Sequence, residues 1–235
     1  MTMAESALLY YITDRAAFRG DASTRRLHLL DKIAEAATQG VDYIQLREKD
    51  LSARDLESLA RDAMRIILKL RAEKSELRTA LLINSRTDVA LATAADGVHL
   101  PANDASPSEV RAAWKCGASA SSMNSEQALA RENSPRDPLI AVSCHSPQEV
   151  TRAASNQASF AVFAPVFEKR SAPGASPTGL DVLHEACRAR IPVLALGGVT
   201  LQNAESCLEA GAAGVAAIRL FQENDIATIV SQLRR

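Results

Sequence analysis

Short hydrophobic runs alternate with longer amphipathic stretches along the whole chain. Eight runs have the composition of buried strands, and they lie at 7–12, 41–46, 79–83, 97–100, 139–144, 160–163, 192–196 and 214–218. Between them, apolar residues recur at helical spacing over 27–38, 53–70, 106–115, 147–155, 179–188, 201–210 and 222–234. A strand followed by a helix, repeated many times, predicts parallel strands joined by crossover helices.

Eight such units predict an α/β protein built as a single (β/α)8, or TIM, barrel over residues 1–235. The strand runs are almost continuously hydrophobic, as expected when both faces of a sheet are covered. A doubly wound open sheet is the alternative fold. The first strand is not followed by G-x-G-x-x-G, and this disfavours the alternative.

Charge and composition narrow the class of protein. Lys plus Arg (27) nearly balances Asp plus Glu (28), so neither nucleic acid nor an anionic membrane is expected as the main partner. Apolar runs such as 191–197 are far shorter than the roughly 20 residues that cross a bilayer, and no secretory signal is evident. The four cysteines form no C-x-x-C pair. These features predict a cytoplasmic protein with free thiols.

Two stretches have no clear period. Residues 117–137 are small and polar and precede a strand, which predicts a loop insertion at the barrel end remote from the chemistry. Residues 171–179 follow a strand instead, and their Gly, Pro and Ser content suits a mobile lid on the active face.

The end of the second strand carries the strongest candidate for anion binding. Because side chains alternate along a strand, Gln45, Arg47 and Lys49 are expected on one face and Glu48 on the other. Two buried cations need an anion, and phosphate or diphosphate oxygens suit an Arg fork beside a Lys point charge. The alternative is an ordinary ion pair, with Glu48 or Asp50 as the partner.

The ends of the seventh and eighth strands predict a second anion site. Gly197 and Gly198 let the backbone approach a ligand, and the helix expected next offers free N–H groups. Ile218 closes the eighth strand. The loops after these two strands commonly form the phosphate cup of such barrels.

Three more residues are candidates at the same barrel end. Asn84 ends the third strand and would reach the mouth, while Asp104, after the fourth, is a candidate Mg²⁺ ligand or, alternatively, a helix cap near Ser106. His145 ends the fifth strand and is a candidate acid–base group, because its reference pKa is about 6.5. A structural His145 is the alternative, and His99, inside a strand, is expected to be structural.

In order and spacing, these segments resemble the thiamine phosphate synthase family and its thiazole tautomerase relatives. The resemblance is carried by 11–15 (YITDR), 45–49 (QLREK), 83–86 (INSR), 95–100 (ADGVHL), 143–146 (SCHS), 164–167 (APVF), 196–199 (LGGV) and 211–215 (GAAGV). It implies a (β/α)8 barrel, a homodimer and no organic cofactor. The synthase joins a hydroxymethylpyrimidine diphosphate to a thiazole phosphate with Mg²⁺ and releases diphosphate. The tautomerase moves protons on a thiazole carboxylate phosphate without a metal.

The resemblance also implies roles for residues. The pyrimidine diphosphate, or an equivalent anion, would be held by Gln45, Arg47, Lys49 and Asn84. The thiazole phosphate would be held by Gly198 and the backbone around Ile218, and His145 matches the tautomerase's acid–base histidine.

The chain departs from the synthase pattern at several positions. Ser85 replaces one of the two Mg²⁺ carboxylates, and Pro101-Ala102 replaces a Gly-Gln pair. Lys169 and Arg170 stand in place of a Thr-x-Thr-Lys diphosphate loop, where they would neutralise a diphosphate with different geometry. Arg219 adds a cation beside the second phosphate site.

These departures favour a tautomerase-like proton transfer that uses His145. The alternative is the synthase reaction, in which Mg²⁺ is required. A second alternative is a barrel that binds a thiamine precursor or a phosphate without turnover.

Overall fold

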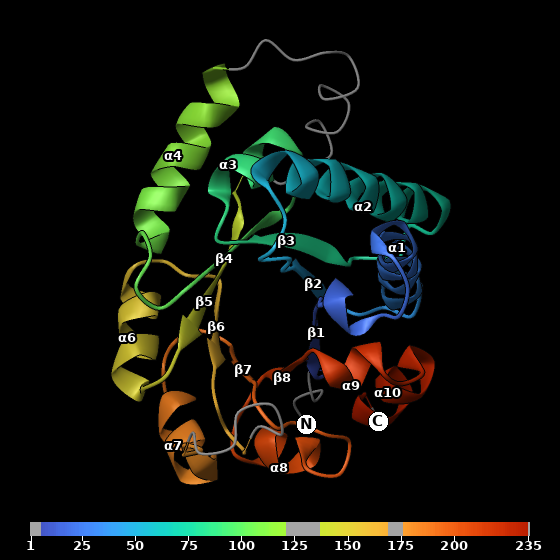
Figure 1. Ribbon diagram of the computed structural model, residues 1–235. Helices are drawn as coiled ribbons and strands as arrows, with labels where there is room; N and C mark the ends of the chain where they lie inside the picture. Colours follow the sequence, from blue (N-terminus) through green and yellow to red (C-terminus); the bar gives the residue numbers. More distant parts are fainter. Residues whose placement is uncertain (1–5, 121–136, 169–175, 235) are drawn as a thin grey trace.

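The structure, a computed structural model that describes residues 6–120, 137–168 and 176–234, is a closed barrel of eight parallel strands (Figure 1). Each strand pairs with its neighbours in sequence, and β8 closes on β1. The strands are β1 (Leu8–Ile12), β2 (Tyr43–Leu46), β3 (Ala80–Asn84), β4 (Gly97–Leu100), β5 (Leu139–Cys144), β6 (Phe160–Phe163), β7 (Val193–Ala195) and β8 (Gly214–Ala217). The predicted (β/α)8 barrel is confirmed, and the alternative of an open sheet is wrong.

Helices surround the strands on the outside (Figure 1). They are α1 (Ala22–Thr38), α2 (Ala53–Glu73), α3 (Thr87–Ala92), α4 (Pro107–Ala120), α6 (Pro147–Ser155), α7 (Gly179–Ala186), α8 (Ala204–Glu209), α9 (Arg219–Gln222) and α10 (Ile226–Leu233), with a short 3₁₀ turn at Arg15–Ala17. Several begin at residues with a capping side chain: Asp21 accepts from the N–H of Thr24 before α1, and Ser146 from that of Glu149 before α6.

Two helical predictions need correction. Helix α4 continues to Ala120, so the first four residues of the insertion expected at 117–137 are helical, in keeping with the high helix propensity of alanine. Residues 121–136 lie outside the described part of the chain. The helix expected over 222–234 begins later, as α10 at Ile226, and a short helix that was not expected, α9, precedes it over Arg219–Gln222.

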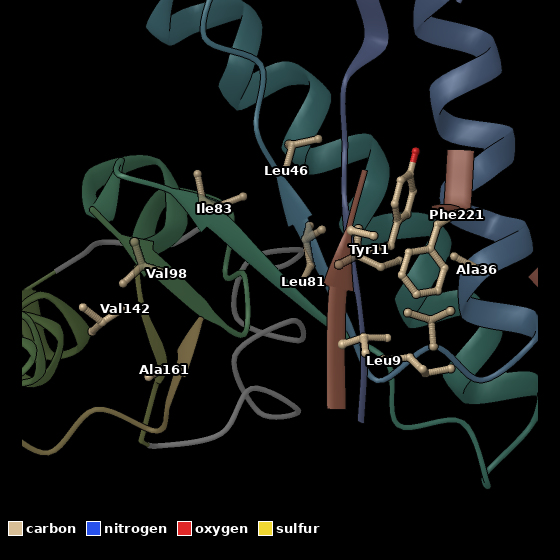
Figure 2. Close-up of a cluster of buried hydrophobic side chains, with 14 of the residues drawn as sticks. Leu9, Tyr11, Ala36, Leu46, Leu81, Ile83, Val98, Val142, Ala161 and Phe221 are labelled. Atoms are coloured by element: carbon tan, nitrogen blue, oxygen red, sulfur yellow. The ribbon is translucent and has the colours of Figure 1, made fainter. Parts of the chain in front are cut away.

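The hydrophobic residues form two separate cores because successive side chains of a strand face opposite ways. The outer core lies between strands and helices. Figure 2 shows part of it, where Tyr11 of β1 packs beside Phe221 of α9 with ring centroids 5.9 Å apart. The inner core fills the barrel and includes Tyr10, Phe160 and Leu194. Alternation along β1 thus sends Tyr10 into the barrel and Tyr11 out toward the helices.

Aromatic rings fill the part of the barrel interior that is nearer the amino ends of the strands. Tyr43 and Phe160, each the first residue of its strand, stack at 4.6 Å, and Tyr10 meets both rings edge-on. Polar side chains replace these rings nearer the carboxyl ends of the strands. The barrel is therefore a packed core with a polar upper layer.

Carboxylates hold the amino ends of two strands. Asp96, just before β4, receives a bond from the N–H of Leu81 at 2.8 Å and pairs with Arg71 of α2 at 2.7 Å. Asp42, just before β2, accepts from the N–H of Leu9 at 2.7 Å. These bonds satisfy buried backbone groups at the end of the barrel opposite to the candidate site. Within the described ranges, every helix is too short or too polar to cross a membrane.

Candidate active site

The carboxyl ends of β2 and β3 bring two predicted residues together. Gln45 is only 2% exposed, and its Nε2 donates to Oδ1 of Asn84 at 3.4 Å. The amide of Asn84 donates in turn to the hydroxyl of Ser85 at 3.1 Å. Ser85 has a φ of +60°, in the left-handed region that turns the chain sharply out of β3. Gln45 and Asn84, to which the resemblance gives the same anion, are therefore in contact.

Arg47 is a half-buried cation at the same barrel end. Its backbone N–H donates to the hydroxyl of Thr13 at 3.0 Å. Among the described residues, its guanidinium makes no hydrogen bond and no ion pair, yet it lies near enough to His99 to lower the pKa of that ring. A partly desolvated guanidinium without a partner is well suited to an anionic ligand.

The strand does not extend as the sequence suggested. Strand β2 ends at Leu46, so the expected alternation through Lys49 is wrong: Lys49 lies exposed in a turn. Glu48 is instead buried, and it accepts from the hydroxyl of Thr13 at 2.6 Å and from the backbone N–H of Arg15 at 3.0 Å. Burial raises the pKa of Glu48, while these bonds oppose the rise.

Arg15, rather than Arg47, is the ion-pair partner of the two carboxylates that follow β2. Its guanidinium reaches Asp50 at 2.5 Å, and its Nε lies 3.8 Å from Glu48. The alternative in which Glu48 or Asp50 neutralises Arg47 is therefore wrong.

The loop after β1 is also fixed from the other side by Gln222 of α9. The side-chain oxygen of Gln222 accepts from the hydroxyl of Tyr11 at 3.1 Å and from the N–H of Asp14 at 3.2 Å. Its amide donates to the carbonyl of Asp14 at 2.6 Å. The sequence analysis did not identify this buried glutamine. The feature that could have indicated its burial is a single polar residue directly after the apolar pair Leu220-Phe221.

A buried hydrogen-bond chain crosses the barrel interior beneath the mouth. The hydroxyl of Tyr10 lies 3.0 Å from Nδ1 of His99, and Nε2 of His99 lies 2.7 Å from the hydroxyl of Ser143. Burial, with a smaller contribution from Arg47, lowers the pKa of His99 to about 3. His99 is therefore neutral near pH 7, and the expectation that it is structural misses its link to Ser143.

His145 stands exposed after β5. Its Nδ1 lies 2.7 Å from the carbonyl oxygen of Ala164, which can only accept, so Nδ1 carries a proton. In the neutral ring Nε2 then keeps its lone pair, as a proton acceptor requires. Ser143, which shares its strand face, is bonded to His99 rather than to His145. Cys144 faces the outer core, away from Ser143, and burial raises its pKa to about 12.

The glycine pair after β7 has a backbone that other residues adopt only under strain. Gly197 and Gly198 have φ values of +97° and +67°. A Cβ on Gly198 would lie 2.6 Å from the carbonyl oxygen of Glu168. The expected helix start is wrong: α8 begins at Ala204 rather than at residue 201, because a turn ending in Asn203 comes first.

Ile218 follows β8 at the barrel end where the glycine pair follows β7. Strands β7 and β8 are parallel neighbours, with Ala195 opposite Val215, so the segments that follow them emerge at the same barrel end. Ile218 immediately precedes α9, and Arg219, the first residue of that helix, is exposed. The helix missed in the sequence therefore starts where the second anion site was expected.

Asp104 lies exposed in the segment between β4 and α4. The cap of α4 is Ser106, whose hydroxyl accepts from the N–H of Glu109 at 3.3 Å, so the capping alternative for Asp104 is wrong. Asp104 and Ser143 line one cavity of about 410 Å³ between this segment and α6. The described residues contain no group of three or more His, Cys, Asp or Glu side chains placed to hold a metal.

Lys169 and Arg170 lie outside the described residues, as does most of the predicted lid at 171–179. Where the description resumes, Thr178 donates from its N–H and its hydroxyl to the carbonyl of Pro165, each at 2.9 Å. The end of this segment is thus held against the segment after β6.

The chain resembles known proteins over nearly its whole length. The sequence model described as thiamine monophosphate synthase matches residues 9–132 and 117–221. The chain is 34% identical over 229 residues to the thiamine-phosphate synthase of Methanoculleus marisnigri, covering 96% of this chain and 93% of that protein. It is 31% identical over 230 residues to the thiamine-phosphate synthase of Syntrophomonas wolfei, covering 97% and 94%. Among solved structures, the thiamine phosphate pyrophosphorylase from Pyrococcus furiosus superposes with a TM-score of 0.69 at 25% identity, covering 97% and 94%.

Proposed function

The chain belongs to the thiamine monophosphate synthase family, and on that premise we propose that it is a thiamine-phosphate synthase. In this reaction the bond between the pyrimidine methylene carbon and the diphosphate oxygen breaks, and diphosphate leaves with the electron pair. The thiazole nitrogen gives its lone pair to the same carbon, and thiamine phosphate forms. The relatives' names support this transferase over the tautomerase-like isomerase that the sequence favoured.

One observation carries the proposal. Arg47 presents a half-buried guanidinium without a described partner, at the barrel end to which the glycine pair and Ile218 also belong. A diphosphate at Arg47, beside the amides of Gln45 and Asn84, would lie across the mouth from a thiazole phosphate at the β7 and β8 loops. Two phosphate-bearing substrates can then be aligned in one mouth, which is the main requirement of a bimolecular substitution.

The side chains at the mouth have separate tasks in this proposal. Arg47 would bind the departing diphosphate and stabilise the charge that develops on it, and Lys49, Lys169 and Arg170 would add positive charge from the surrounding loops. Gln45 and Asn84 would orient the pyrimidine substrate. Gly198 and the Ile218 backbone would hold the thiazole phosphate, with Arg219 adding a cation there.

In this proposal a Mg²⁺ ion would be held largely by substrate oxygens, since the described residues contain no cluster of three ligating side chains. Asp104 would provide the protein carboxylate, and it shares a cavity with Ser143 of the barrel wall. Mg²⁺ commonly binds one or two carboxylates together with substrate phosphates, so the loss of a second carboxylate at Ser85 is compatible with binding. When bound, Mg²⁺ would neutralise charge on the departing diphosphate. The expected assembly is a homodimer.

The direct test is a turnover assay. Purified protein is incubated with hydroxymethylpyrimidine diphosphate, thiazole phosphate and Mg²⁺, and thiamine phosphate and diphosphate are quantified together. We expect the two products in equal amounts, with His145→Gln retaining most of the rate because the synthase reaction needs no proton shuttle at that ring.

Two other outcomes would contradict the proposal. Isomerisation of a thiazole carboxylate phosphate without formation of thiamine phosphate, abolished by His145→Gln, would establish the tautomerase. Tight binding of both substrates without either reaction would establish a binding protein.

A further inference from the structure

We propose that Gln222 of α9 is a positioning residue for Arg47, which lies in the segment after β2. Gln222 acts through the loop after β1, because its side chain binds both backbone groups of Asp14 and this loop in turn binds the backbone of Arg47. The role of Arg47 as the residue that binds diphosphate rests on the proposed function. The hydrogen bonds that lead from Gln222 to Arg47 do not.

Gln222 supplies the partners that the sheet cannot give to the backbone of Asp14. Strands β1 and β8 pair only as far as Tyr11 and Ala217, and Asp14 lies beyond this ladder. The side-chain oxygen of Gln222 accepts from the N–H of Asp14 at 3.2 Å, and its amide donates to the carbonyl of Asp14 at 2.6 Å. A carboxamide offers one acceptor and a donor, as a peptide group does, so Gln222 takes the place of a missing strand partner.

The side chain of Gln222 is itself held in place. It is only 8% exposed, and its oxygen also accepts from the hydroxyl of Tyr11 at 3.1 Å. The ring of Tyr11 packs beside Phe221, the residue before Gln222 (Figure 2). Helix α9 has four residues, which is too few for a helix to be stable alone, so these tertiary contacts fix its position. The amide of Gln222 is therefore a fixed point for the loop after β1.

Thr13 connects this fixed loop to Arg47. It directly precedes Asp14 and is fully buried, and its N–H donates to the carbonyl of Gln45 at 3.0 Å. The Thr13 hydroxyl donates to Glu48 at 2.6 Å and accepts from the backbone N–H of Arg47 at 3.0 Å. A displacement of Asp14 would therefore move Thr13 and, with it, the backbone from which the guanidinium of Arg47 extends.

A purely structural role for Gln222 makes a different prediction. If Gln222 only stabilised the closure of the barrel between β8 and β1, its loss would lower the free energy of unfolding without changing the backbone at Arg47. Thr79→Val is the matched control for such a loss. Thr79 also makes a buried side-chain hydrogen bond, to the carbonyl of Val41 at 2.6 Å, but at the amino ends of the strands.

Amide hydrogen exchange tests the link to Arg47 without any ligand. Gln222→Met keeps the length of the side chain and removes its hydrogen-bonding groups. In this variant of the full-length protein, the backbone N–H of Arg47 should exchange about tenfold faster than in the wild type, as measured by nuclear magnetic resonance near neutral pH. In Thr79→Val this exchange rate should stay close to that of the wild type. An unchanged rate in Gln222→Met, or an equal increase in Thr79→Val, would overturn the proposal.

Pyrophosphate binding tests the consequence for the anion site. By calorimetry, Gln222→Met should bind pyrophosphate about fivefold more weakly than the wild type but should cause no further loss in an Arg47→Ala background, because a positioning residue acts only through the group that it positions. The same fold loss in both backgrounds would refute the positioning role.

A second variant keeps this test decisive if Gln222→Met does not fold. Gln222→Asn retains the amide but is one methylene group shorter, so it cannot bind both backbone groups of Asp14 as Gln222 does. Its loss of pyrophosphate affinity should likewise disappear in the Arg47→Ala background, and an affinity equal to that of the wild type would refute the proposal. Failure of the synthase assay with these results intact would overturn only the proposed function.

Discussion

At the scale of single residues, the proposed anion binding depends on Arg47. The backbone N–H of Arg47 donates to the hydroxyl of Thr13, which in turn donates to Glu48. The backbone position from which the guanidinium extends is therefore fixed by hydrogen bonds. The nearby carboxylates Glu48 and Asp50 are already engaged by Arg15. A guanidinium that is supported but unpaired loses little when it binds an anion, because no existing ion pair must break.

Replacement of this side chain should weaken ligand binding without unfolding the protein. Arg47→Ala is expected to reduce the affinity for pyrophosphate by at least tenfold, since a hydrogen bond to a charged group contributes roughly 1.5–3 kcal/mol. Calorimetric titration measures the change. Arg65→Ala is the matched control, because Arg65 is an exposed arginine of α2 that pairs only with Asp62 at 2.8 Å in the described structure. Equal losses of pyrophosphate affinity in the two variants would show that the loss reflects the net charge of the protein rather than a contact with Arg47.

Some residue contacts could be predicted from sequence and others could not. Gln45 and Asn84 meet because both lie near the carboxyl ends of neighbouring parallel strands, which the order of strands predicts. The partner of Glu48 depends on where β2 ends, and a shift of the strand end changes which side chains alternate into the barrel. The bond between Tyr10 and His99 joins residues 89 positions apart, and its register is set only by the closed barrel.

At the scale of elements, the segment after β7 is shaped by close packing. Gly198 combines a positive φ with carbonyl and side-chain atoms of Glu168 and Phe167 inside 3 Å of a Cβ position. Gly179 has a similar φ of +81°, but no described atom lies within 4 Å of its Cβ position. A side chain at Gly179 would therefore cause backbone strain alone, whereas a side chain at Gly198 would cause both backbone strain and steric overlap.

The pair of glycines gives a matched prediction for stability. Gly179→Ala should lower the free energy of unfolding by roughly 1–2 kcal/mol, the cost of a left-handed backbone. Gly198→Ala should cost about 1–3 kcal/mol more, because the new methyl group must displace backbone atoms. Urea denaturation measures both variants. Equal costs at the two positions would contradict the close packing described at Gly198.

Element positions followed the hydrophobic pattern well where both sheet faces are covered. The runs at 97–100, 139–144 and 160–163 coincide with β4, β5 and β6. Element ends were less predictable, as the later starts of α8 and α10 and the unexpected α9 show. These ends depend on turns and on tertiary bonds, such as that of Gln222 to Asp14, rather than on the local period.

At the scale of the whole molecule, the two ends of the barrel differ in chemistry. At the amino ends of the strands, ion pairs such as Arg71–Asp96 are complete and bind backbone groups as well. At the carboxyl ends, Arg47 has no described partner and amide and hydroxyl groups line the interior. In the proposed function, the amino ends would contribute mainly to stability and the carboxyl ends to ligand binding, as the direction of parallel strands allows.

A crystal structure of the protein with pyrophosphate and thiazole phosphate tests the central claim most directly. The account predicts pyrophosphate in contact with the guanidinium of Arg47 and the amide of Asn84, with the thiazole phosphate on the backbone at Gly198 and Ile218. Both ligands would then occupy one mouth. Pyrophosphate at the amino ends of the strands, or on the arginines of α2 with Arg47 untouched, would contradict the account.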